Sequence, residues 1–522
     1  MNQKVSAPLR DLVNDARAAE IRGDWITASE KYREAVSLAP LDAYVCYRAG
    51  NSLLEAGDAE GSLQYLEKAS MLAPGTIEFN LKLGEIFFSL RRFGEAIDTY
   101  KQVLAIDPNN VSASNNIGIC LQEAGEIDDA ISAMQHSLRI APDDPIVHAN
   151  FGSALLKARR ADEALEHLIE ATSKNVKHAE AWSNLGVAFQ ETLKLDEALD
   201  AHRTALALAP DNSSIRYNLS MTLLLLGEYI DGFEAFEHRR HMPDRKPRSF
   251  DIPEWFGESL VGKSVLVHAE QGAGDTIMFA RFLNRLTDSG AHITFSVQQS
   301  LESLEFTFAK SVDVKSGKIE PTDFDYQIPL LSLPSRFDIS LQDIGNSEPY
   351  IVPPQALQNT KSDVPRIGLV WAGNPNHTND LNRSIPFAKL APLLALPQIQ
   401  WVSLQVGERA ADIAKSNSSI EDLSAGLQNF SDTAAAIANL DLVVTVDTSV
   451  AHLAGAMGAK VWILLPYAPD WRWLLNRQDT PWYPQARLFR QTEPKAWDPV
   501  IMQVSAATAQ KEYANQINMI ET

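Results

Sequence analysis

The sequence has little cysteine and no obvious metal-binding pattern. Its 522 residues include only Cys46 and Cys120, too few for a disulfide-stabilised secreted domain. Both fall on apolar helical patterns, which predicts small buried thiols. Because no Cys/His cluster has metal-ligand spacing, we expect no metal site.

Long apolar runs and excess positive charge are also missing. No stretch reaches the roughly 20 apolar residues that cross a membrane, and residues 1–10 lack the apolar core of a signal peptide. We therefore expect a cytoplasmic protein with no membrane span. The formal charge of −21 argues against binding to nucleic acid. The basic run 237–248 is predicted to be a solvated linker.

A thirty-four-residue period runs through the first half. Prolines recur at this spacing, with Val176 filling one gap, at Pro40, Pro74, Pro108, Pro142 and Pro210. Small residues keep step at Gly50, Gly84, Gly118, Gly152 and Gly186, and at Ala28, Ala96, Ala130, Ala164 and Ala198. The pattern resembles the tetratricopeptide repeat. It predicts a tail at 1–8 and an α solenoid of about seven helix pairs over 9–242.

The small residues should lie where the two helices of a pair approach most closely, with Tyr32, Tyr100 and Phe236 filling the large position between them. His202 takes that position in one repeat and is predicted to be a satisfied core histidine. Such a stack presents a concave surface that binds protein segments. Asparagine amides there could clamp an acceptor peptide, or could be merely exposed; the candidates are Asn51, Asn80, Asn115, Asn150 and Asn184.

The second half alternates strand and helix patterns after a linker at 243–261. Strands are predicted at 264–268, 291–297, 326–331, 366–373, 400–404, 442–446 and 460–465, with helices over 277–286 and 432–439. This order predicts mostly parallel sheets covered by helices, in an N-terminal half (262–360) and a C-terminal half (361–522). Gly272 and Gly274 precede a helix that begins near Asp275, and glycines let backbone approach a ligand closely.

The segment 442–458 is the most informative one. An apolar, β-branched strand ends in Asp447-Thr448-Ser449, and a small-residue helix follows at once. The unpaired N–H groups of the first helical turn can bind an anion, and ligands of α/β sheets bind at such strand ends. The pattern predicts a phosphate-bearing ligand, a nucleotide; the alternative is an ordinary strand–helix cap.

These residues carry a family resemblance. Gly274-Asp275 and the run from Asp447 to His452 resemble two motifs of the GT-B glycosyltransferases in the ADP-heptose:lipopolysaccharide heptosyltransferase family. The arrangement of solenoid and transferase also resembles bacterial tetratricopeptide-repeat glycosyltransferases, including those that modify flagellin. The resemblance implies a GT-B fold and inverting, metal-independent transfer from a nucleotide sugar. That donor is a substrate, so no cofactor is expected.

The resemblance also implies roles for single residues. Asp275 matches the proposed general base, which takes the proton of an acceptor hydroxyl; its alternative role is a helix cap. The donor diphosphate is expected at Thr448 and Ser449, with Asp447 holding the turn. Arg383, in the polar loop after Gly373, is the counterpart of a family lysine. His452 either touches the diphosphate or packs the helix.

Some features depart from the family. Ser449 replaces a glycine, and the first half is short, which suggests that the solenoid supplies acceptor surface and favours a protein acceptor. A polysaccharide or lipopolysaccharide acceptor, or a non-catalytic scaffold with a degenerate transferase half, are the alternatives. Asp323-Phe-Asp325 matches a metal motif of another transferase fold, but is interpreted as a solvated strand entrance. Four aromatic residues are predicted to be core: Trp471, Trp473, Trp482 and Tyr483.

Overall fold

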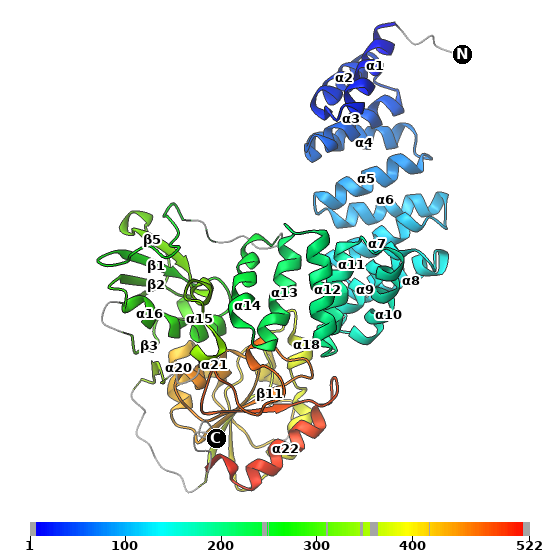
Figure 1. Ribbon diagram of the computed structural model, residues 1–522. Helices are drawn as coiled ribbons and strands as arrows, with labels where there is room; N and C mark the ends of the chain where they lie inside the picture. The colour runs from blue at the N-terminus through cyan, green and yellow to red at the C-terminus, as the bar shows by residue number, and fades with distance from the viewer. Residues whose placement is uncertain are drawn as a thin grey trace. The chain divides into compact units, whose positions relative to one another are not determined.

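The computed structural model describes residues 7–242, 248, 250–308, 312–344, 348–354, 364–416 and 418–514. It divides into two compact units between Phe189 and Gln190, and Figure 1 labels helices and strands of both. Parts of three predicted boundaries, namely the tail at 1–8, the linker at 243–261 and the junction at 360/361, lie outside the described residues.

The N-terminal unit is a tetratricopeptide-repeat solenoid, as predicted. Helices α1 to α10 pair in chain order and α11 follows them. Their bounds are α1 (Ala7–Ile21), α2 (Trp25–Leu38), α3 (Ala43–Glu55), α4 (Ala59–Leu72), α5 (Ile77–Ser89), α6 (Phe93–Ile106), α7 (Val111–Ala124), α8 (Ile127–Ile140), α9 (Pro145–Lys157), α10 (Ala161–Lys174) and α11 (Ala179–Glu191). Asp24, Asp42 and Asp58 cap helices by accepting a hydrogen bond from a first-turn N–H group.

Close helix contacts in this unit explain the small residues. A Cβ atom on Gly50 would lie 2.6 Å from Cγ of Leu66, and one on Gly152 would lie 2.6 Å from Cγ of Leu168. Because real side chains do not approach so closely, these positions require glycine. Tyr32 and Tyr100 fill the large positions and are buried, and both cysteines are buried free thiols, as predicted.

The C-terminal unit begins with helices of the repeat pattern. These are α12 (Leu195–Leu208), α13 (Ser213–Leu226) and α14 (Tyr229–Phe236), followed by a 3-10 turn, η1 (Glu237–His241). Phe233 of α14 makes edge contacts with Phe279 and Trp471 of the α/β region. The last repeat helix therefore belongs to the same core as the strands that follow it.

The basic run is not simply the solvated linker that the sequence predicts. Arg239 is only 1% exposed, and its guanidinium pairs with Glu237 and Glu270, each at 2.6 Å. Arg240 forms a two-pronged pair with Glu254. A buried guanidinium is tolerated because carboxylates compensate its charge. The run thus joins the repeats to the α/β region.

The first sheet is parallel, in the order β4-β2-β1-β5. Its strands are β1 (Ser264–His268), β2 (His292–Ser296), β4 (Val312–Lys315) and β5 (Tyr326–Pro329), while β3 (Glu305–Phe306) and β6 (Ile351–Val352) form a separate antiparallel pair. Its helices are α15 (Ala273–Phe279), α16 (Leu283–Thr287) and α17 (Leu333–Arg336). The single helix predicted over 277–286 is thus two, joined by a 3-10 turn at Ala280–Phe282.

The second sheet is also parallel, in the order β12-β11-β10-β7-β8-β9. Its strands are β7 (Arg366–Val370), β8 (Gln400–Ser403), β9 (Glu421–Asp422), β10 (Leu442–Val446), β11 (Val461–Leu465) and β12 (Ala486–Arg490). Its helices are α18 (Asp380–Arg383), α19 (Ala391–Leu394), α20 (Phe430–Ile437), α21 (Ser449–Ala456) and α22 (Trp497–Ala509). The predicted α/β class is confirmed, although β7 stops three residues short of Gly373.

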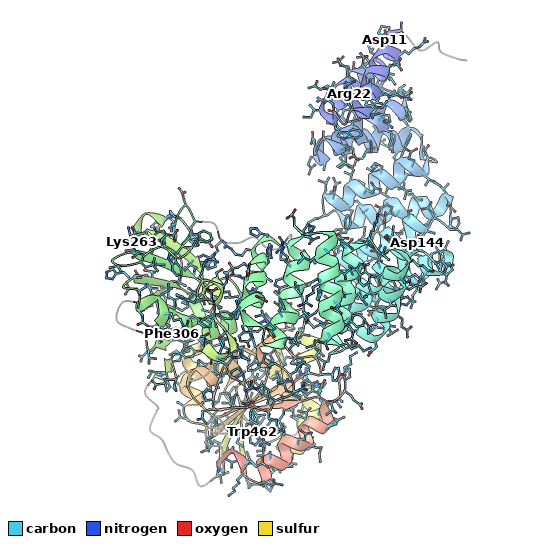
Figure 2. The ribbon with its side chains drawn as sticks, in the orientation of Figure 1. Asp11, Arg22, Asp144, Lys263, Phe306 and Trp462 are labelled. Carbon is cyan, nitrogen blue, oxygen red and sulfur yellow. The ribbon has the colours of Figure 1, made fainter. Side chains whose placement is uncertain are left out.

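Both faces of the second sheet are covered. Along β11, Ile463 packs into one apolar cluster, whereas Leu464 and Trp462, which is labelled in Figure 2, pack into another on the opposite face. This alternation follows from the two-residue period of a strand. Every residue of β10 and β11 is buried, which explains why these strands read as unbroken apolar runs.

Candidate functional site

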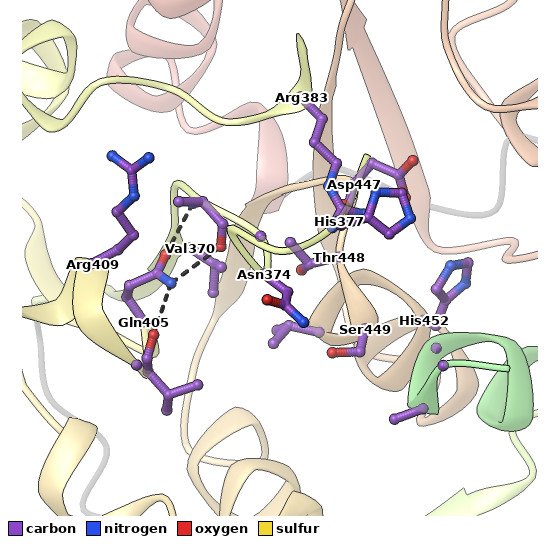
Figure 3. A pocket seen from close by; sticks show the side chains of 18 of the residues that line it. Val370, Asn374, His377, Arg383, Gln405, Arg409, Asp447, Thr448, Ser449 and His452 are labelled. Atoms are coloured by element: carbon purple, nitrogen blue, oxygen red, sulfur yellow. Dashed lines mark hydrogen bonds between the residues drawn. The ribbon is translucent and has the colours of Figure 1, made fainter. Parts of the chain in front are cut away.

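A cavity of about 510 Å³ lies at the carboxyl ends of β7, β8 and β10 (Figure 3). Its walls come from the loops after β7 and β8, from the start of α21 and from the 3-10 turn η10 (Trp471–Trp473). The start of α15, in the first α/β half, closes it from the other side. Ligands of parallel α/β sheets bind at such an edge.

The two predicted motifs meet in this cavity because α15 and α21 lie side by side (Figure 1). Gly274 makes the contact possible. A Cβ atom there would lie 2.9 Å from Cδ2 of His452 and 3.3 Å from Cα of Ser449. Gly272 is the N-cap of α15, so Gly272 and Gly274 both stand at the start of the helix that lies beside α21.

The start of α21 lines the cavity at the end of β10. Thr448 is the N-cap, and its hydroxyl lies 3.1 Å from that of Thr445, one residue before the strand end. Ser449 is the first helical residue and lines the cavity. The Ala451 N–H group donates to the Thr448 carbonyl at 3.0 Å. N–H groups of a first helical turn that have no such acceptor can donate to a phosphate.

Arg383 brings positive charge to the same place. Its Nη1 donates to the carbonyl oxygen of Asp447 at 3.0 Å. The guanidinium lies against Gly373, where a Cβ atom would come within 2.5 Å of Nη2. Gly373 therefore leaves the space that Arg383 occupies at the end of β7.

Asp275 does two things in this structure. Its Oδ2 accepts from the N–H group of Gly272 at 3.0 Å, which stabilises the start of α15. Its Oδ1 accepts from Nη2 of Arg472. The aspartate is thus the third helical residue rather than the N-cap, and it also lines the cavity.

Burial shifts the pKa values of Asp447 and His452 in opposite directions. Desolvation raises the pKa of Asp447 to about 6; the Asp470 carboxylate adds to this, while Arg383 and Arg472 oppose it. Desolvation likewise holds the pKa of His452 well below its ordinary value. His452 shares a hydrogen bond of 2.9 Å with the Tyr483 hydroxyl and stacks on Trp473. These contacts give it a packing role, and its contact with a diphosphate stays a prediction.

Several cavity residues were missed by the sequence reasoning. Arg472, Asp470 and Arg409 are charged, and His377 and Gln405 also line the wall. The polar loop after Gly373 already pointed toward His377. The one signal for Arg472 is its place between two tryptophans, in a segment interpreted only as apolar core.

The predicted core aromatics are confirmed, since Trp471, Trp473, Trp482 and Tyr483 are all buried. Asp325 accepts from the Ser264 N–H group and from Lys263 Nζ, both at 2.9 Å, and stands at a strand entrance. Within the described ranges, no group of three or more His, Cys, Asp or Glu side chains is arranged to hold a metal ion. Nor does any described helix combine the length and apolar character of a membrane span.

The asparagines of the solenoid have different environments. Asn80 is fully buried; its amide donates to the Pro74 carbonyl at 3.1 Å and accepts from the Ser70 hydroxyl, so it fixes a turn instead of facing a peptide. Asn115 is buried and accepts from Asn150 in the next repeat at 3.2 Å. Asn150, like Asn51 and Asn184, is half-buried, and peptide binding there stays a prediction.

Comparison with known proteins identifies tetratricopeptide repeats in the N-terminal half of the chain. Residues 53–114 and 87–150 match one tetratricopeptide repeat family model, and residues 150–213 match a second. The chain is 28% identical over 341 residues to Protein FlbA of Caulobacter vibrioides, covering 58% of this chain. That match spans 56% of the relative, little more than half its length.

Two solved structures are similar to the repeats. A tetratricopeptide repeat protein from Parabacteroides merdae is 14% identical with a TM-score of 0.41, covering 46% of this chain and 95% of its own. A tetratricopeptide repeat protein of Thermus thermophilus is 22% identical with a TM-score of 0.31, covering 35% of this chain and 99% of its own. The N-terminal region consists of tetratricopeptide repeats, a class that generally mediates protein–protein interaction.

Proposed function

We propose that the chain is a glycosyltransferase that moves a sugar from a nucleotide-sugar donor to an acceptor protein held by the repeats. Its two α/β halves would form a GT-B-type pair with the cavity between them. The observation that carries this proposal is the meeting of Gly274-Asp275 with the start of α21 in one cavity. These segments are far apart in the sequence.

The chemistry of the cavity suits a nucleoside diphosphate. The start of α21 offers N–H groups, and Arg383 and Arg472 add two permanent positive charges. A volume of about 510 Å³ is within the range of small-molecule sites. The loops after β7 and β8 also line the cavity, with Asn374, Pro375, Gln405 and Val406 among their residues, and would contact the nucleoside.

In the proposed reaction, an acceptor hydroxyl attacks the anomeric carbon while the bond from that carbon to the diphosphate breaks. Asp275 takes the hydroxyl proton, and the nucleoside diphosphate leaves with the bonding electrons. The α21 N–H groups and Arg383 stabilise the charge that develops on the leaving group. Attack opposite the leaving group inverts the anomeric centre.

Nucleotide binding is the first test. Thermal unfolding would be followed with ADP, GDP, UDP, CMP and dTDP, for the natural protein and for Arg383→Ala. A ligand at a hundred times its Kd adds about 2.7 kcal/mol of stability. Arg285→Ala is a matched control, because Arg285 is an exposed arginine paired with Asp343, outside the cavity.

Stabilisation by one nucleotide, lost in Arg383→Ala and kept in Arg285→Ala, supports the donor site. No response to any nucleotide overturns it and favours a repeat scaffold. Where a donor binds, Asp275→Ala should abolish sugar transfer while nucleotide binding remains. Mass spectrometry of cellular proteins and glycolipids, with and without the enzyme, then shows which class gains the sugar. A gain on protein indicates a protein acceptor, and a gain on glycolipid indicates a polysaccharide or lipopolysaccharide acceptor.

A further inference from the structure

Arg472 is held between two carboxylates in the wall of the cavity. Its Nη1 donates to Oδ1 of Asp470 at 2.8 Å, and its Nη2 donates to Oδ1 of Asp275. The guanidinium also lies over the ring of Trp471, with 4.5 Å between its carbon and the ring centroid. Its side chain is 10% exposed, and Nε is buried without a partner among the described residues.

This pair joins the two α/β halves. Asp275 comes from α15 in the first half, whereas Arg472 and Asp470 come from the segment after β11 in the second. Asp470 also accepts from the Arg472 backbone N–H at 3.1 Å, so it is fixed to the same turn. Of the two carboxylates, Asp470 is the permanent neighbour and Asp275 is the one that can separate.

The pairing leaves Asp275 occupied. Oδ1 accepts from Arg472 and Oδ2 accepts from Gly272, so both oxygens already have donors. A general base has to accept the hydrogen bond of the hydroxyl whose proton it takes. The Arg472 guanidinium takes one of the acceptor directions of Oδ1, so it competes with an incoming hydroxyl for that oxygen.

Charge balance indicates what can separate the pair. Among the residues that line the cavity, the carboxylates of Asp275, Glu408, Asp447 and Asp470 outnumber the guanidinium groups of Arg383, Arg409 and Arg472. Desolvation alone would lower the pKa of Arg472, but Asp470 and Asp275 raise it above its ordinary value, so the guanidinium stays charged. An incoming diphosphate carries more negative charge than one carboxylate, so it competes with Asp275 for the N–H groups of Nη2.

We propose that Arg472 changes partners when the donor binds. Its Nη2 leaves Asp275 for the diphosphate, while Nη1 keeps its bond to Asp470, and Oδ1 of Asp275 becomes free to accept the proton of the acceptor hydroxyl. Arg472 is then the positioning residue that couples donor occupancy to the general base. This inference rests on the proposed function and adds an order of events to it: the donor binds first, and Asp275 then becomes able to act as the general base.

The exchange makes Asp275 a competitor of the donor. Asp275→Asn keeps the shape of the side chain but weakens the pair, so it should bind the nucleoside diphosphate more tightly, by roughly three- to tenfold. Titration calorimetry with the nucleotide that stabilises the natural protein measures this. If the Arg472–Asp275 pair has only a structural role, Asp275→Asn should bind the nucleotide more weakly, because the weakened pair would disturb the site.

Removing one negative charge could also strengthen binding without any exchange, so a double-mutant cycle is needed. In an Arg472→Gln background, the gain from Asp275→Asn should disappear. Arg472→Lys repeats the cycle with the charge kept, since one ammonium cannot bridge both carboxylates as a guanidinium does. The Arg472→Lys background replaces the Arg472→Gln background if the glutamine variant does not fold.

The outcomes are distinct. A gain in Asp275→Asn that vanishes in the Arg472 backgrounds supports the exchange. Equal or weaker binding by Asp275→Asn, or a gain that persists without Arg472, overturns it while the donor site stands. Absence of nucleotide binding by the natural protein overturns the proposed function as well.

Discussion

The hydroxyl of Tyr229 accepts a hydrogen bond of 3.1 Å from Nε1 of Trp482, a residue 253 positions later in the chain. Both side chains are buried, and Tyr229 also meets the edge of Trp471. Tyr229 begins the last repeat helix, whereas Trp482 belongs to the second α/β half. The end of the solenoid is therefore built into the α/β core, and the compact units divide at Gln190 instead of after the last repeat.

Tyr229→Phe should destabilise the C-terminal unit. The substitution leaves the Trp482 indole N–H buried without its acceptor, which costs about 1–3 kcal/mol. Urea unfolding followed by tryptophan fluorescence measures the change. Tyr65→Phe, at a half-buried tyrosine of α4, is the control and should change stability by less than about 0.5 kcal/mol. An equal loss in both variants would contradict this account.

His202 should make the protein sensitive to acid. It is a core residue as predicted, but neither ring nitrogen has a partner among the described residues, so it is not satisfied. Burial lowers its pKa from 6.5 to about 4. A lowered pKa means that the neutral ring stabilises the fold above pH 6.5, and that about 3 kcal/mol is lost as the pH falls toward 4.

His202→Met should remove that acid dependence and raise stability at neutral pH as well. Methionine fits because Met134 fills the same position of an earlier repeat, where it is fully buried. Denaturant unfolding at pH 7.5 and at pH 4.5 compares the two proteins. Parallel pH profiles would show that His202 is not responsible.

Gly84 should not tolerate even one added methyl group. A Cβ atom there would overlap the ring of Tyr100, which is fixed in the core. Gly84→Ala is expected to cost about 1–3 kcal/mol. Gly94→Ala is the matched control in the partner helix α6, because a Cβ there meets nothing within 4 Å. It should stabilise the helix by up to about 1 kcal/mol. Similar thermal shifts in the two variants would contradict this.

Asp447 should make nucleotide binding depend on pH. Its pKa of about 6 lies above the ordinary 3.8, so the protonated form is favoured in the fold. The stability that the protonated Asp447 contributes to the fold is present below pH 4 and is lost as the pH rises through 6. Ionised Asp447 repels a diphosphate, so affinity should fall roughly tenfold between pH 5 and pH 8.

Asp447→Asn separates this effect from the ionisation of the ligand itself, which is the same for both proteins. Affinity measured by calorimetry across that pH range should change much less in the variant. Equal pH dependence in the two proteins would exclude Asp447 as the titrating group.

Local patterns predicted much of this protein. The thirty-four-residue spacing identified the helix pairs, since each pair repeats the same short-range packing. The strands at Ser264–His268 and Leu442–Val446 have the predicted bounds, because buried parallel strands are continuous apolar runs. The resemblance to two glycosyltransferase motifs predicted that Gly274-Asp275 and the start of α21 belong to one site, and the structure brings both segments to one cavity.

The tertiary structure alone decided which groups complete the cavity. Arg472 meets Asp275 across 197 residues of sequence, and no local pattern encodes such a contact. The role of Asn80 also depends on the tertiary structure. Packing of the repeats buries its side chain, which then donates a hydrogen bond to the Pro74 carbonyl and stabilises the turn there. Periodicity records which face of an element is apolar; which polar groups then meet depends on how the elements pack, and that is a property of the whole fold.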